Sequence, residues 1–158
     1  MAYVVRRPEQ ELPVAFETSM VGDAMSRGII SCPPETPLRV VSRMMATFGV
    51  HAIFVFEQED EYDGALRPWG VVSDLDLVAA TQLDLDTITA GVTAVTPFVT
   101  VAADRPLGEA ASLMAQHGIA HLAVTDPLSR QPIGVVSTLD VARAVAAGHG
   151  ACETFPSA

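Results

Sequence analysis

Two separate parts of the chain space their hydrophobic residues three or four positions apart, which predicts helices that each bury one face. The first set is Leu38, Val41, Met45 and Phe48, and the second is Leu107, Ala110, Met114 and His117. Pro37 and Pro106 precede these sets, where a first-turn proline is favourable, and Thr36 is expected to cap the first helix. Gly49 and Gly118 predict where the two helices end.

Each predicted helix is followed by two short apolar runs that predict strands. The runs are AIFVF (52–56) and WGVV (69–72) in the first part, and HLAV (121–124) and IGVV (133–136) in the second. They show little alternation of polar and apolar residues, so both faces of each sheet are expected to be covered. A further helix follows each pair of strands. Its apolar face is expected to carry Leu75, Val78 and Ala79 in the first part, and Leu139, Ala142, Val145 and Ala146 in the second.

The two parts are copies of one unit. The segment GVVSDLD (70–76) returns as GVVSTLD (134–140), and the stretch that begins at Glu35 aligns with the one at Asp104 at a constant offset of 69 positions. Each copy predicts the order β–α–β–β–α in about 60 residues. Because one copy would bury little surface alone, we expect an α/β (α+β) fold in which two βαββα repeats pack sheet against sheet with pseudo-twofold symmetry.

The duplication also predicts the domain boundaries. The first repeat is expected at residues 19–81 and the second at 91–147, with a connector at 82–90 between them. An N-terminal segment (1–18) precedes the repeats, and a C-terminal tail (148–158) follows them. The connector contains the acidic stretch LDLDTIT.

Composition narrows the functional classes. The chain has 158 residues, of which 49% are hydrophobic, as expected of a well-buried globular protein. Its formal net charge of −10 disfavours nucleic-acid binding, because such a surface repels phosphate backbones. It has no apolar run long enough to cross a membrane and no secretory signal, so we expect a cytoplasmic protein. It lacks a nucleophile elbow, a phosphate-binding loop and a dinucleotide fingerprint, so we do not expect an enzyme.

A serine and an aspartate stand three positions apart at the start of the last helix of each repeat, as Ser73 with Asp76 and Ser137 with Asp140. One reading is a capping box, in which each side chain bonds the backbone of the other residue. The second reading is a ligand site. A helix N-terminus with a serine hydroxyl binds phosphate, and an aspartate one turn later accepts bonds from the two hydroxyls of a ribose. Spacing alone leaves both readings open.

The duplicated βαββα order and the two strand-end motifs G-h-h-S-x-x-D, where h is apolar, resemble a tandem pair of CBS domains, the Bateman module. The resemblance covers about Ser19 to Ala147. It implies a regulatory module that binds adenosine-containing ligands in two clefts between the repeats. Such pairs often form dimers and are usually attached to an enzyme, channel or transporter, although they also occur alone.

The resemblance implies which residues line the two clefts. The first cleft would use Ser137, Asp140, Val135, Met25, Ile30, Val50 and His51. The second would use Ser73, Asp76, Val71, Val99, Ile119 and Ala120. Members of the family often carry a His–Arg pair that reaches phosphates, and here those positions read His51–Ala52 and Ala120–His121. His121 is therefore a further candidate, and neither copy keeps the arginine.

The missing arginines affect the expected ligand. Without them, the sequence shows little positive charge for a triphosphate. Five other arginines could supply positive charge, but the sequence does not indicate whether they lie near a cleft: Arg27, Arg43, Arg67, Arg130 and Arg143. We therefore favour AMP, ADP or S-adenosylmethionine, and ATP only if Mg²⁺ carries the charge. We expect no covalent cofactor. We expect no metal site either, because His117 and His121 do not share a helix.

The sequence thus predicts a ligand sensor that signals to a partner protein whose identity is unknown. The alternative, from another class, is a constitutive structural or dimerisation module with no small-molecule ligand. We also expect a homodimer, because the helix faces are larger than one core requires. The residues behind that expectation are Val41, Met44, Met45, Ala111 and Met114.

Overall fold

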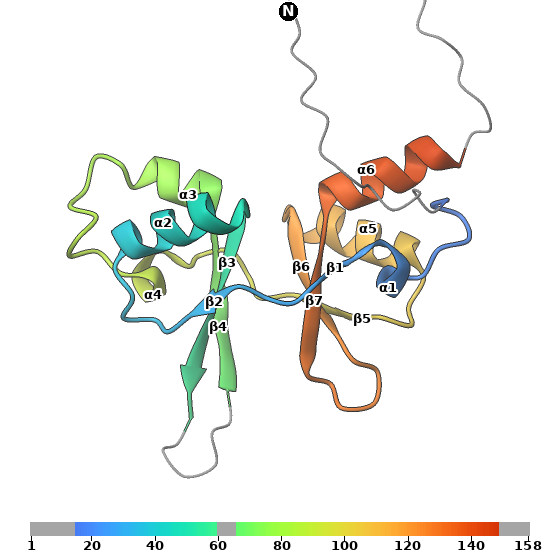
Figure 1. Ribbon diagram of the computed structural model, residues 1–158, viewed down its shortest axis with the longest axis horizontal. Helices are drawn as coiled ribbons and strands as arrows, with labels where there is room; N and C mark the ends of the chain where they lie inside the picture. Colours follow the sequence, from blue (N-terminus) through green and yellow to red (C-terminus); the bar gives the residue numbers. More distant parts are fainter. Residues whose placement is uncertain (1–14, 60–65, 149–158) are drawn as a thin grey trace, which may run out of the picture.

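The computed structural model describes residues 15–59 and 66–148 (Figure 1). The N-terminal half contains α1 (Val21–Ala24), β1 (Ser26–Arg27), β2 (Ser31–Cys32), α2 (Leu38–Phe48), β3 (Ala52–Gln58), β4 (Leu66–Ser73) and α3 (Asp74–Ala79). The C-terminal half contains α4 (Ala90–Thr93), β5 (Thr100–Ala102), α5 (Leu107–His117), β6 (His121–Thr125), β7 (Pro132–Ser137) and α6 (Thr138–Ala147). Both copies therefore follow the predicted order, with β2 and β5 as the first strand of each repeat.

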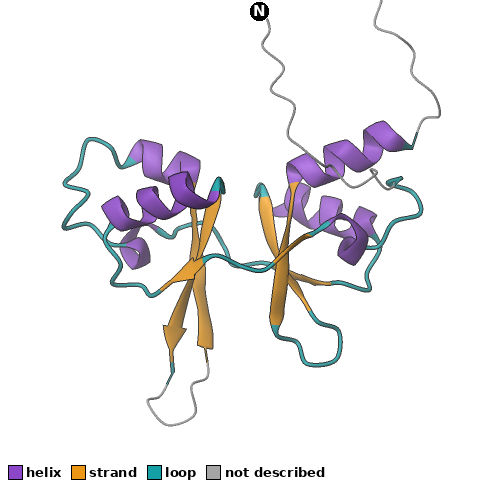
Figure 2. Cartoon of the chain, viewed as in Figure 1, coloured by secondary structure: helices purple, strands orange, loops and turns teal. Residues whose placement is uncertain are grey.

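The strands form two sheets that face each other, with helices on the outer side of each sheet (Figure 2). One sheet has the order β2-β3-β4, and the other has the order β1-β7-β6-β5. In each sheet the first strand of the repeat runs parallel to the next strand, which pairs antiparallel with the third. The predicted fold of two βαββα repeats is confirmed.

The alternation of side chains along β3 explains why residues 52–56 are all apolar. Ile53 and Val55 pack into the core beneath the helices of the first repeat. Phe54 and Phe56 face the other sheet, where both contact the ring of Phe98 edge-on, with centroids 5.3 and 5.1 Å apart. Such contacts add to the free energy gained by burying the rings. The sheet therefore buries both faces, as the lack of alternation predicts.

Each repeat contributes its first short helix to the core of the other repeat. Val21 of α1 is fully buried with Leu107 and Leu122 of the second repeat, and Ala90 of α4 is fully buried with Leu38 of the first. The strand β1 then pairs antiparallel with β7 of the second repeat. The two copies are thus joined by an exchange of segments, which brings residues of both to the same cleft.

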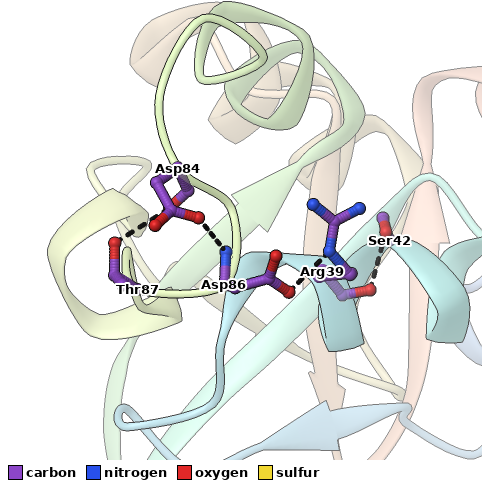
Figure 3. A network of polar contacts seen from close by, with 5 residues as sticks. All are labelled: Arg39, Ser42, Asp84, Asp86 and Thr87. Carbon is purple, nitrogen blue, oxygen red and sulfur yellow. Dashed lines mark hydrogen bonds and ion pairs between the residues drawn. The ribbon is translucent and has the colours of Figure 1, made fainter.

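The connector binds the N-terminus of α2 (Figure 3). The backbone N–H groups of Leu38 and Arg39 donate to the carbonyls of Ile88 and Leu85, both at 2.9 Å. Nε of Arg39 also lies 2.5 Å from Oδ1 of Asp86. The expectation that Thr36 caps this helix is wrong. Pro37 is the N-cap residue and makes no side-chain cap, because connector carbonyls satisfy the free N–H groups instead.

Two expectations about exposed surface need correction. Val41, Met45 and Met114 are buried inside their own repeats, so they offer no surface to a second chain. By contrast, the apolar faces predicted for the last helices point outward. Leu75 and Val78 of α3 are 73% and 62% exposed, and Leu139 and Val145 of α6 are also exposed. Among the described residues, no helix has the length and apolar character needed to cross a membrane.

Candidate functional site

Both Ser–Asp corners form capping boxes with nearly identical geometry. In the second repeat, the backbone N–H of Ser137 donates to Oδ2 of Asp140 at 2.8 Å, and Oγ of Ser137 accepts from the backbone N–H of Asp140 at 3.3 Å. In the first repeat, the same two bonds between Ser73 and Asp76 measure 2.8 and 3.1 Å. The capping reading of the motif is therefore correct for both corners.

One of these corners opens onto a large cleft between the repeats. The cleft has a volume of about 940 Å³, which suits a nucleoside-sized ligand. Seven residues from the predicted site line it: Ile30, Val50, His51, His121, Val135, Ser137 and Asp140. Met25, which was also predicted here, packs instead against the core of the second repeat. The structure thus brings most of the first predicted cleft together.

Two arginines line the same cleft, and the sequence did not place them. Arg27 lies on β1 opposite Gly134 of β7, so the strand exchange carries it from the first repeat into the cleft. Arg143 lies one turn after Asp140 on α6, and its Nη1 is 3.6 Å from Oδ1 of that residue. The position of Arg143, three residues after Asp140, was a usable sequence signal. That of Arg27 depends on pairing between the repeats, which no local pattern reveals.

The two cleft histidines differ in their surroundings. Nδ1 of His51 lies 2.8 Å from Oδ2 of Asp74, and the N–H of Asp74 donates to the carbonyl of His51 at 2.9 Å, so this pair is fixed at the cleft rim. His121 is more enclosed, and its burial lowers its pKa below the usual value near 6.5; nearby Asp74 opposes the shift. His121 is therefore neutral at pH 7 and can donate or accept a hydrogen bond.

The second predicted cleft is not brought together in the same way. Among the described residues, neither Ser73 nor Asp76 lines the large cleft. Oγ1 of Thr96 donates to Oδ2 of Asp76 at 3.2 Å. The other residues predicted for this cleft do not line the large cleft either. Val71 lies between the sheets, Val99 packs on the second core, and Ile119 and Ala120 border a separate hollow of about 440 Å³ beside α5 and α6.

The chemistry of the first cleft suits an anionic ligand with an apolar part. Residues at the N-terminus of the ten-residue helix α6 line the cleft, where the positive end of the helix dipole favours an anion, and two guanidinium groups add positive charge. Apolar side chains of Ile30, Val50 and Val135 form other parts of the wall. Among the described residues, no group of three or more His, Cys, Asp or Glu side chains is arranged to hold a metal ion.

Solved structures with the same fold include several CBS proteins. A CBS domain protein from Pyrobaculum aerophilum, complexed with AMP, is 28% identical and has a TM-score of 0.65, covering 77% of this chain and 88% of its own. An uncharacterised conserved protein from Pyrococcus horikoshii is 22% identical with a TM-score of 0.66, covering 88% and 98%. A CBS domain pair in complex with 5′-methylthioadenosine and S-adenosyl-L-methionine is 18% identical with a TM-score of 0.61, covering 79% and 94%.

No curated protein matches the chain. The CBS domain family, however, matches it twice, at residues 21–82 and 92–147, which together make up most of the sequence. These two matches coincide with the duplicated unit. The chain therefore belongs to the CBS domain family and contains a tandem pair of these domains.

Proposed function

We propose that this chain is a sensor that binds an adenosine-containing ligand in the cleft beside Ser137 and Asp140. The observation that carries the proposal is the 940 Å³ cleft itself, because it collects candidate residues from both repeats at the N-terminus of α6. The relative from Pyrobaculum aerophilum, which is complexed with AMP, supports this class of ligand.

The residues of the cleft suit the parts of such a ligand. Ile30, Val50 and Val135 offer an apolar wall for the adenine ring. The carboxylate of Asp140 can accept bonds from the ribose hydroxyls, because its Oδ1 takes no bond from Ser137. The hydroxyl of Ser137 and the N–H groups at the start of α6 can bind a phosphate.

Signalling would follow from the position of the cleft between the repeats. The ligand would contact β1 and β3 residues from the N-terminal half together with β7 and α6 from the C-terminal half. It therefore stabilises arrangements in which both sets of residues face it, which shifts the population of conformations. A partner protein that binds one of these arrangements more tightly would sense the ligand. We further propose that the chain is a homodimer and is regulatory rather than catalytic.

Isothermal titration calorimetry of ligand-stripped protein with AMP, ADP, ATP and S-adenosylmethionine tests the proposal. We expect saturable binding of at least one compound, lost in Asp140→Asn. Circular dichroism spectra of the variant must match those of the wild type, so that lost binding is not lost folding. If none of the four compounds binds, the sensor proposal is wrong.

The alternative of a purely structural module makes a different prediction. In that case none of the compounds would raise the melting temperature, because only binding to the folded state stabilises it. Both capping boxes are compatible with this alternative. The large cleft with two arginines is the observation that favours the sensor.

A further inference from the structure

The two Ser–Asp corners share their internal hydrogen bonds, but among the described residues only the corner of Ser137 lines a large cleft together with two arginines. The strand pairing matches His121 with Ala52, because Ser137 pairs with His121 and Ser73 pairs with Ala52, and the sequence offset between the repeats matches the other residues. Four such side chains line the open cleft: Arg27, His51, His121 and Arg143. The corresponding residues of the other copy, in the same order, are Thr96, Ala120, Ala52 and Ala79. Each is uncharged, and three are alanine.

The charge at the two helix starts differs in the same direction. The first turn of α3 carries two carboxylates, Asp74 and Asp76, whereas the first turn of α6 carries only Asp140. In addition, α3 has six residues and α6 has ten, so the helix dipole of α3 is shorter than that of α6. An anion is therefore disfavoured at α3 and favoured at α6.

At the first corner, Thr96 pairs with Val71 as Ser26 pairs with the equivalent Val135 in the other copy. Its hydroxyl donates to Oδ2 of Asp76 at 3.2 Å, and its carbonyl accepts from the N–H of Val71 at 3.1 Å. The same Oδ2 also accepts from the N–H and the hydroxyl of Ser73, both at 2.8 Å. One carboxylate oxygen thus joins three donors from two separate segments of the chain.

We propose that the chain binds a single nucleoside phosphate, in the cleft at Ser137, and that the corner of Ser73, Asp76 and Thr96 is a structural joint. This inference rests on the proposed function and adds the number of ligands per chain and their charge. Arg27 and Arg143 are the residues that select the phosphate, because a charged donor makes a stronger bond to a phosphate oxygen than a neutral one does. Thr96 holds the segment before β5 against the start of α3.

Titration calorimetry with AMP and with adenosine tests both parts on the full chain. We expect one AMP per chain, bound about tenfold or more tightly than adenosine, because the phosphate adds charge-assisted bonds. Arg143→Ala and Arg27→Thr place at the cleft the residues of the other copy. Each is expected to reduce the preference for AMP over adenosine while leaving adenosine binding nearly unchanged. Arg143 is partly exposed, so its replacement should preserve folding even if Arg27→Thr does not.

Thr96→Val is the matched control, because it removes only the hydroxyl that reaches Asp76. We expect it to lower the melting temperature and leave both the affinity and the stoichiometry of AMP unchanged. Two AMP molecules per chain, equal affinities for AMP and adenosine, or weaker AMP binding by Thr96→Val would each overturn the inference and leave the sensor proposal standing. If the wild type binds neither AMP, adenosine nor the other compounds tested above, the sensor proposal itself fails.

Discussion

The backbone N–H of Ser137 lies 2.8 Å from Oδ2 of Asp140, and the hydroxyl of Ser137 lies 2.9 Å from the same oxygen. This leaves Oδ1 of Asp140 directed toward the guanidinium of Arg143, 3.6 Å away. The two oxygens of one carboxylate therefore have separate partners. One holds the start of α6, and the other faces Arg143, which lines the cleft together with Asp140. Capping and ligand binding are compatible roles for this residue.

Replacing either capping serine should separate these two roles. Ser73→Ala and Ser137→Ala each remove a side-chain cap, so each should reduce the free energy of unfolding by about 0.5–2 kcal/mol. Only Ser137→Ala should also weaken AMP binding, because only that corner lines the large cleft. Urea unfolding and calorimetry measure the two effects.

Ser112→Ala is a suitable control for this comparison. Ser112 is an exposed residue inside α5 whose hydroxyl bonds the carbonyl of Gly108, so its loss removes no cap. We expect little change in stability or binding, since alanine favours helices. Equal loss of AMP binding in both capping variants would contradict the assignment of one cleft.

The stability of the protein should depend on the protonation of His121. Burial lowers the pKa of His121 in the folded state, so the unfolded chain binds a proton at higher pH than the folded chain does. Protons therefore favour unfolding as the pH falls through the unfolded value near 6.5, and stability declines until the lower folded pKa is reached. His121→Gln should flatten this dependence between about pH 7.5 and 5.5.

The comparison variant for this pH series is His117→Gln. His117 is exposed at the end of α5 and is not among the groups that shift the pKa of His121, so its replacement should leave the slope contributed by His121 in place. Urea unfolding at several pH values gives the slopes for the wild type and both variants. If His121→Gln keeps the slope of the wild type, the burial of His121 does not control the effect.

Local patterns were sufficient to predict the two long helices. Leu38, Val41 and Met45 recur at helical spacing and are buried in α2, and Gly49 ends that helix with a positive φ of 64°. A period of three to four residues reports on the face of one element, so it does not depend on the rest of the fold. The exchange of α1 between repeats could not be read in this way, because Val21 packs with residues far along the chain.

In the candidate site, too, local patterns predicted some residues, whereas others depend on contacts between distant parts of the chain. Ser137 and Asp140 could be selected from their spacing, and the duplication then indicated the partners on the opposite repeat, such as Val50. The sequence did not place Arg27 in the cleft, because its position there depends on the pairing of β1 with β7. The bond that distinguishes the first corner was not predicted either, because Thr96 and Asp76 are 20 positions apart in the sequence.

The ion pair at the connector should contribute little, despite its short distance. The side chains of Arg39 and Asp86 are 46% and 61% exposed, so water and salt screen their attraction. Asp86→Ala should therefore change the melting temperature by no more than about 1 °C, since exposed ion pairs stabilise proteins weakly. The backbone bonds from Leu38 and Arg39 to the connector would remain in place.

Leu38→Ala provides the contrast at the same helix start. Leu38 is fully buried, so removing its side chain should lower the free energy of unfolding by about 2–5 kcal/mol. Thermal unfolding of both variants at low and high salt measures the difference. A large, salt-sensitive loss in Asp86→Ala would instead show that the ion pair holds the connector.

The outward apolar residues of α3 and α6 predict where two chains meet. Val78 is 62% exposed and Val145 is 48% exposed, and neither is needed for its own repeat's core. Exposed apolar surface of this kind on helices is typical of an interface between identical subunits. We expect light scattering after gel filtration to give twice the mass of one chain at micromolar concentration. Val78→Glu and Val145→Glu should shift the protein to monomer, because each would bury a charge at the interface.

Leu128→Glu is the control, since Leu128 is 93% exposed in the loop between β6 and β7 and lies on neither helix. A wild type that remains monomeric, or a Leu128→Glu variant that dissociates as readily as the two helix variants, would contradict this interface.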